Sequence, residues 1–256
     1  MEKHTPEIDL SGLAPEVAAV VRPFAEELLA GLSGGIETLA LTGSCLTGDY
    51  IPGVSDINSV VVLKEIALTE LDALSRTFAH FKRKRVRVPL VVTQEYIRRS
   101  LDCFPIEFLD LKLFHKTICG PDPFSGLAVD ASTLRLQCEH DLKGKLVHLR
   151  RGYIACAGKP RDLKALLLEA FPGYFPLLRA MLSLVKKNEA PPAGKASVLI
   201  EAESAFNLSL AGLREILALK AEKKWFSSDH RRYSDLFAEV CRITHDLSAA
   251  MDSHPL

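Results

Sequence analysis

The chain has 256 residues, of which 48% are hydrophobic, enough to bury the core of one large domain or of two small ones. Its 32 Lys and Arg side chains balance its 32 Asp and Glu side chains, so no net field draws it to nucleic acid or to an anionic membrane. Short basic runs at 82–87 and 220–232 are interpreted as solvated helix ends. We therefore expect neither nucleic acid nor a membrane as a partner, and no apolar stretch is expected to reach the roughly eighteen residues of a membrane span.

The cysteine pattern gives an expectation for the compartment. The six cysteines are scattered without a C-x-x-C pair, and no signal peptide precedes the first predicted helix. Both features favour a reducing cytoplasm. Cys45 is the thiol nearest to the motif described below, and we interpret it as a small buried side chain.

Helices and strands alternate in the first half of the chain. Apolar periodicity predicts, in order, a helix over 15–32 with a kink or restart at Pro23, a strand over 36–41, a strand through 56–63, a helix over 69–82, a strand over 84–92 and a short helix over 94–102. The segment 106–118 fits either a strand or a helix. The turn residues Gly120-Pro121-Asp122-Pro123 then end an α/β domain, whose boundary we place near residue 128.

The second half has helical spacing throughout. Its predicted segments are 132–157, 160–187 with a break at Pro172-Gly173, 195–222, and 229–252. An all-helical bundle over 129–256 is therefore expected to follow the α/β domain over 1–128.

Residues 41–63, LTGSCLTGDYIPGVSDINSVVVL, contain the most informative motif. A strand runs into a Gly43-Ser44 turn, and Asp56 and Asn58 follow at alternate positions of a second strand, which places them on one face. A Gly-Ser turn can offer backbone N–H groups to a phosphate, and oxygen side chains opposite it can hold a cation. The pattern predicts a nucleotide site.

These residues resemble the signature of the polymerase-beta-like nucleotidyltransferase superfamily, a Gly-Ser pair followed by Asp-x-Asp on a strand. The layout is most similar to that of the bacterial aminoglycoside adenylyltransferases. The resemblance implies an α+β domain with a mixed sheet before the helical domain, a nucleoside triphosphate as substrate and Mg²⁺ as cofactor. It also implies transfer of a nucleoside monophosphate to an unidentified hydroxyl acceptor, either a small molecule or a protein. The residues that it assigns are Gly43, Ser44, Ser55 and Arg87 for the nucleotide, and Asp56 and Asn58 for metal binding and catalysis.

The motif departs from that family at two of its three carboxylates. Asn58 replaces the second aspartate, and alignment of the strand over 84–92 places Arg87 where the third acid would stand. Losing one charge at 4 Å costs roughly 4 kcal/mol at an effective dielectric near 20, and each 1.36 kcal/mol is about tenfold in rate. The acids weighed as replacements are Asp49, Glu95, Glu107 and Asp110. Arg87 itself fits two interpretations: a fixed cation on a phosphate, or a solvated strand end.

Three hypotheses follow from the sequence. The chain is an atypical nucleotidyltransferase, a catalytically inactive pseudoenzyme that senses or scaffolds through the same pocket, or a module that binds a protein partner through its helical domain. The Arg135-x4-His140 spacing is similar to that of HEPN ribonucleases, but an Arg and a His on an amphipathic helix are usually surface or cap groups. The sequence does not identify the nucleobase, the acceptor or the oligomeric state.

Overall fold

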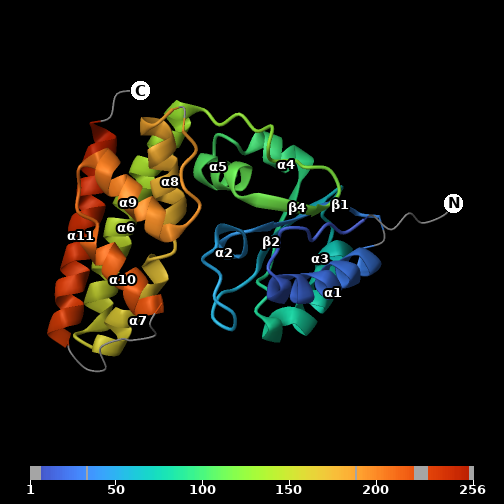
Figure 1. Ribbon diagram of the computed structural model, residues 1–256, viewed down its shortest axis with the longest axis horizontal. Helices are drawn as coiled ribbons and strands as arrows, with labels where there is room; N and C mark the ends of the chain where they lie inside the picture. The colour runs from blue at the N-terminus through green and yellow to red at the C-terminus, as the bar shows by residue number, and fades with distance from the viewer. Residues whose placement is uncertain (1–6, 33, 188, 222–229, 254–256) are drawn as a thin grey trace. The chain divides into compact units, whose positions relative to one another are not determined.

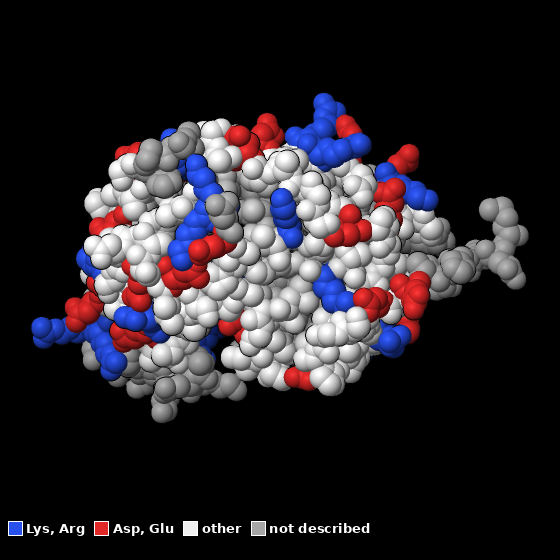
Figure 2. All heavy atoms as spheres, turned by 45° about the horizontal axis from the view of Figure 1, so that its top comes forward, with Lys and Arg blue, Asp and Glu red and all other residues white. Residues whose placement is uncertain are grey.

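The computed structural model describes residues 7–32, 34–187, 189–221 and 230–253. The chain divides into two compact units, the first made of residues 1–103 and 108–128, the second of residues 104–107 and 129–256 (Figure 1). Most of the predicted basic run at 220–232 lies outside the described residues. On the face drawn in Figure 2, acidic and basic side chains are intermixed, as on an ordinary solvated surface.

A four-stranded sheet organises the first unit. Its strands lie in the order β3-β2-β1-β4, and β1 is antiparallel to both of its neighbours while β2 and β3 are parallel. The bounds are β1 Ile36–Thr42, β2 Asn58–Leu63, β3 Leu90–Thr93 and β4 His115–Cys119. The sheet is therefore mixed, as the resemblance implied.

Helices bury both faces of this sheet. On one face α1 (Pro15–Gly31) and α3 (Leu68–Phe81) pack together. The ring of Phe24 packs edge-on against the rings of Phe78 and Phe81, with centroid distances of 5.7 and 5.4 Å. The other face is covered by buried side chains of α4 (Gln94–Arg99) and α5 (Pro105–Leu113). Successive apolar residues of β1 and β2 point to opposite faces of the sheet and so supply both cores. The helix α1 continues through Pro23.

Two of the predicted strands are shorter than expected. The strand through 56–63 begins only at Asn58, so Asp56 precedes it. The predicted strand over 84–92 is reduced to β3, preceded by a 3-10 turn over Lys82–Lys84 and an isolated bridge at Val86. Pro89 explains the late start of β3, because proline has no N–H to donate to a ladder. The ambiguous segment 106–118 contains both a helix, α5, and a strand, β4.

In the residues that the structure describes, six helices form the second unit. They are α6 Ala131–Cys156, α7 Pro160–Ala170, α8 Tyr174–Val185, α9 Lys195–Phe206, α10 Ala211–Ala221 and α11 His230–Asp252. The break at Pro172-Gly173 is confirmed, but the single helix predicted over 195–222 is wrong. It is two helices, because Asn207 adopts the left-handed conformation with φ +50° and ends α9.

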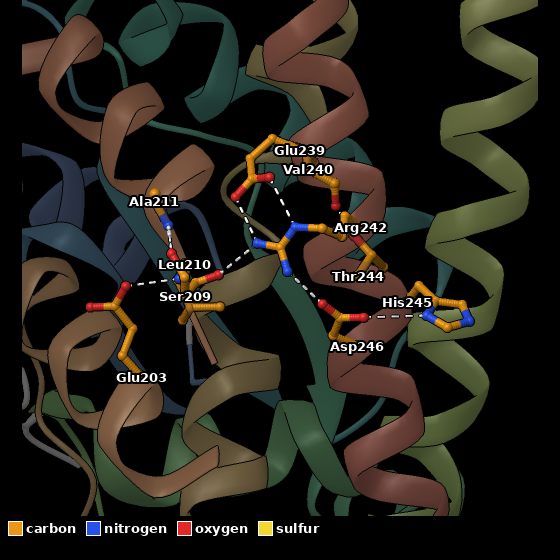
Figure 3. A network of polar contacts seen from close by, with 10 residues as sticks. All are labelled: Glu203, Ser209, Leu210, Ala211, Glu239, Val240, Arg242, Thr244, His245 and Asp246. Atoms are coloured by element: carbon orange, nitrogen blue, oxygen red, sulfur yellow. Dashed lines mark hydrogen bonds and ion pairs between the residues drawn. The ribbon is translucent and has the colours of Figure 1, made fainter. Parts of the chain in front are cut away.

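A polar network joins α11 to the start of α10 (Figure 3). Arg242 donates to Glu239 at 2.7 and 2.9 Å, to Asp246 at 2.6 Å and to the carbonyl of Ser209 at 3.2 Å. The Arg242 side chain is 45% exposed, so solvent screens these ion pairs and their contribution to stability is small. Their fixed geometry instead orients α11 relative to the loop before α10.

The stretch Pro160–Val185, which contains α7 and α8, is long and apolar enough to cross a membrane by length and composition alone. The expectation that no stretch would reach that length is therefore wrong. Most of this stretch is buried inside the unit, and a core helix passes the same test.

Candidate functional site

The turn after β1 brings Gly43 against Asn58. Gly43 has φ +81° and ψ −153°, and the four-residue helix α2 (Ser44–Thr47) begins directly after it. A Cβ atom built on Gly43 would lie 2.9 Å from Nδ2 of Asn58. Both the backbone angles and the close approach require glycine at this position.

Two polar side chains beside this turn are available to a ligand. The hydroxyl of Ser44 and the amide of Asn58 are half-buried, and neither makes a hydrogen bond to the part of the chain that the structure describes. Because both groups are also partly exposed to solvent, they can contact a phosphate or another polar ligand.

Cross-strand pairing extends this polar edge of the sheet. Thr42 of β1 is directly opposite Asn58 of β2 and His115 of β4, so the three side chains form a row on one face. His115 is nearly buried and held in place by the carbonyl of Leu111 at 2.6 Å from Nδ1 and by Asp122 at 2.8 Å from Nε2. Sequence reasoning missed His115, because only the strand register places it beside the motif.

Two arginines hold the carboxylate of Asp56. Arg85 approaches Oδ1 at 3.0 Å, and Nε of Arg87 donates to Oδ2 at 2.7 Å. The parallel bridge between Ile57 and Val86 brings these residues together. Because Ile57 and Val86 are buried, their neighbours along both segments face the opposite side. We call Asp56, Arg85 and Arg87 the arginine clamp.

Arg85 is constrained by more than this ion pair. Its φ of +62° is unusual for a side chain of this size. Its guanidinium also donates to the carbonyl groups of Val54 and Ser55, so the clamp closes the loop before β2. The hydroxyl of Ser55, predicted to contact the nucleotide, accepts a hydrogen bond at 2.9 Å from the backbone N–H of Ile51 and keeps its own O–H as a donor.

The donor set does not fit the predicted Mg²⁺ site. Both oxygens of Asp56 are already engaged by guanidinium groups: Oδ2 accepts a hydrogen bond from Arg87, and Oδ1 forms an ion pair with Arg85. Asn58 offers an amide oxygen without charge. Among the described residues there is no group of three His, Cys, Asp or Glu side chains placed to hold a metal ion. A magnesium ion beside a triphosphate normally has one or two carboxylate ligands. In this arrangement the positive charge beside Asp56 comes from Arg85 and Arg87.

The four acids considered as substitutes for the missing carboxylates interact with other groups. Glu95 pairs with Arg98 and Arg99 along α4, and Glu107 accepts a hydrogen bond from Gln137 at 3.1 Å. Asp49 accepts a hydrogen bond from Thr47 at 2.9 Å, and Asp110, which lies within α5, also has an interaction.

The thiol of Cys45 lacks the low pKa that a catalytic thiol needs. Burial raises its pKa to about 11, and Sγ approaches the carbonyl oxygen of Thr42 at 3.4 Å. A protonated thiol is a poor nucleophile, so Cys45 is a packing residue.

The Arg135 and His140 side chains of α6 have separate partners. Arg135 contacts Glu139 and the carbonyl of Met251, whereas His140 pairs with Asp141. These contacts do not bring the two side chains into one site. His140 is an exposed surface group, whereas Arg135 is half-buried and donates to a carbonyl in the last turn of α11.

No family model and no curated protein matches the chain. Among solved structures it is similar to spectinomycin adenyltransferase AAD(9) from Enterococcus faecialis, a structure with ATP and spectinomycin. The TM-score is 0.56 at 12% sequence identity, and the match covers 90% of this chain and 98% of that one. The likeness shows the fold: a nucleotidyltransferase-like α/β unit with a mixed sheet, followed by a helical one.

Proposed function

We propose that the chain binds a nucleoside triphosphate at the Gly43 turn, with Ser44 and Asn58 contacting the phosphates. The observation that carries this proposal is a pair of half-buried polar side chains, without a hydrogen bond to any described residue, beside a turn that only glycine can form. The fold supports it, since the similar adenyltransferase structure contains ATP.

The arginine clamp supplies positive charge for such a ligand. Arg87 donates to Asp56 through Nε, so both of its terminal nitrogens remain available to a ligand. Its side chain is 68% exposed. A guanidinium group binds phosphate oxygens in a fixed planar geometry. Asp56 then acts as a positioning residue that orients Arg87 toward the phosphates.

The clamp also favours one hypothesis over another. Transfer of a nucleoside monophosphate by the two-metal route needs free carboxylates, and the Asp56 oxygens are both engaged. We therefore infer a nucleotide-sensing or scaffolding pseudoenzyme. Adenylyl transfer to a small-molecule or protein hydroxyl is the second candidate, supported by the likeness to an adenyltransferase.

Calorimetric titration of ATP, GTP, CTP and UTP tests the proposal, with Mg²⁺ present and with the metal chelated. We expect at least one triphosphate to bind in both conditions. Arg87→Ala should weaken binding about tenfold, because it removes a charge-assisted hydrogen bond. Asp56→Ala should weaken binding less, because the two arginines lose their orientation but keep their charge.

Arg98→Ala is the matched control. Arg98 is equally exposed, at 70%, and also pairs with one carboxylate, but it lies on α4. The Arg98→Ala variant should bind the triphosphate with the same affinity as the unmodified chain. Equal losses in the Arg87 and Arg98 variants would contradict the proposal, and strictly Mg²⁺-dependent binding that Asp56→Ala abolishes would favour the transferase. Release of pyrophosphate in the presence of an acceptor would establish the second candidate.

A further inference from the structure

The helical unit contains a hollow that the nucleotide proposal does not use. It lies between α6 and the turn that joins α7 to α8, and it has a volume of about 380 Å³. Its polar lining consists of His140, Asp141, Lys145, His148 and Glu169, with Gly173 at the turn. The hollow lies entirely within the second unit.

Lys145 is the unusual member of this lining. Its ammonium group lies 4.8 Å from the centre of the Tyr174 ring and makes no ion pair or hydrogen bond to any residue in the described ranges. Burial lowers the pKa of Lys145, and the nearby Asp141 opposes this shift only in part. A charge withdrawn from water without an anionic partner costs free energy that a bound anion would offset.

Gly173 leaves room for this amine. A Cβ atom built on Gly173 would lie 2.6 Å from Nζ of Lys145, closer than any normal contact. The backbone of Gly173, with φ −72°, is compatible with any residue, so the missing side chain matters for space and not for conformation. A side chain at position 173 would therefore displace the Lys145 amine from its present place in the hollow.

The other lining groups narrow the chemistry of the occupant. His140 and His148 can donate to an anionic oxygen, whereas Asp141 and Glu169 accept hydrogen bonds and repel a second negative group. We propose that this hollow binds a small organic anion, with its phosphate or carboxylate on Lys145 and its hydroxyl groups on Asp141 and Glu169. The proposal is independent of the nucleotide site.

The test uses the full chain and four probes: glycerol 3-phosphate, lactate, inorganic phosphate and glycerol. Binding is measured by saturation-transfer NMR and by calorimetry. We expect glycerol 3-phosphate or lactate to bind more tightly than inorganic phosphate or glycerol, because only they carry both an anionic group and an alcoholic hydroxyl. The tighter of the two shows whether the hollow prefers the phosphate probe or the carboxylate probe.

Two variants and one control locate the binding. Lys145→Gln removes the charge and Gly173→Ala pushes the amine aside, and each should weaken binding about tenfold, as expected for one charge-assisted contact. Lys143→Gln is the control, since Lys143 lies on the same helix but is exposed and pairs with Glu139. Equal affinity in the Lys145 and Lys143 variants, or no binding of any probe at millimolar concentration, would overturn the proposal. If Lys145→Gln fails to fold, the Gly173→Ala result decides.

Discussion

The double variant Asn58→Asp/Arg87→Asp is expected to make nucleotide binding depend on Mg²⁺. Asp at position 58 keeps the shape of Asn while adding a charge next to Gly43, and Asp at position 87 frees Oδ2 of Asp56. Three carboxylates would then be available to bind Mg²⁺. Each attracts a unit positive charge at 4 Å by roughly 4 kcal/mol at an effective dielectric near 20, before the cost of dehydrating the ion is subtracted. We expect Mg²⁺ to tighten ATP binding at least about tenfold in this variant, the equivalent of 1.4 kcal/mol of net gain.

Two further variants separate the effect of Asn58→Asp from that of removing Arg87. Asn58→Asp alone leaves the arginine clamp intact and should bind ATP more weakly than the unmodified chain without Mg²⁺, because it adds a negative charge beside the phosphates. The double variant Asn58→Asp/Arg98→Asp has the same change in formal charge at a distant exposed position, so it controls for net charge. If it responds to Mg²⁺ as strongly as the Arg87 double variant, the effect is not local. No response in either would contradict the prediction.

Local signals in the sequence were sufficient to predict much of the first unit. Short apolar runs predict β1 and β2, and the Gly43-Ser44 turn is predicted from the strand before it. Asp56 and Asn58 do lie at alternate positions, although only Asn58 is within the strand. These features depend on residues close together in the chain, where periodicity and turn chemistry are informative.

The arginine clamp could not be predicted in the same way. Arg85 and Arg87 lie in a basic run, which is usually solvated, and their partner is about thirty residues away in the chain. Their contact depends on one parallel bridge, Ile57 to Val86, whose register no local pattern specifies. The row formed by Asn58, Thr42 and His115 likewise depends on which residues of three strands are opposite each other.

The break between α9 and α10 was missed for a different reason. Apolar spacing continues across residues 195–222, but a single left-handed residue, Asn207, redirects the chain. Asparagine tolerates this conformation better than most residues, yet it also occurs within helices. Composition alone therefore does not distinguish a capped helix from a continuous one.

Replacing Gly120 by Ala is expected to destabilise the sheet unit by about 3 kcal/mol or more. Gly120 follows β4 with φ +82°, and a Cβ atom there would lie 1.9 Å from the carbonyl oxygen of Glu37 and 3.2 Å from Cα of Thr38. Both are backbone atoms of β1, so no side-chain rotation relieves the clash. Moving the chain would also break the hydrogen bond of 2.7 Å from the buried hydroxyl of Thr38 to the carbonyl of Pro121.

Two control variants distinguish the cost of a left-handed backbone from the cost of a steric clash. Gly12 has φ +75° and open space around its Cβ position, so Gly12→Ala should cost only the roughly 1 kcal/mol of a left-handed residue. Gly126→Ala has neither penalty and should leave stability unchanged. Urea unfolding followed by circular dichroism ranks the three variants, and hydrogen exchange in peptides covering β1 and β4 locates the loss. Because β4 holds His115 opposite Thr42, faster exchange there would show that Gly120 also maintains the polar edge of the sheet. A loss no greater than that of Gly12→Ala would mean that β1 adapts around the new methyl group.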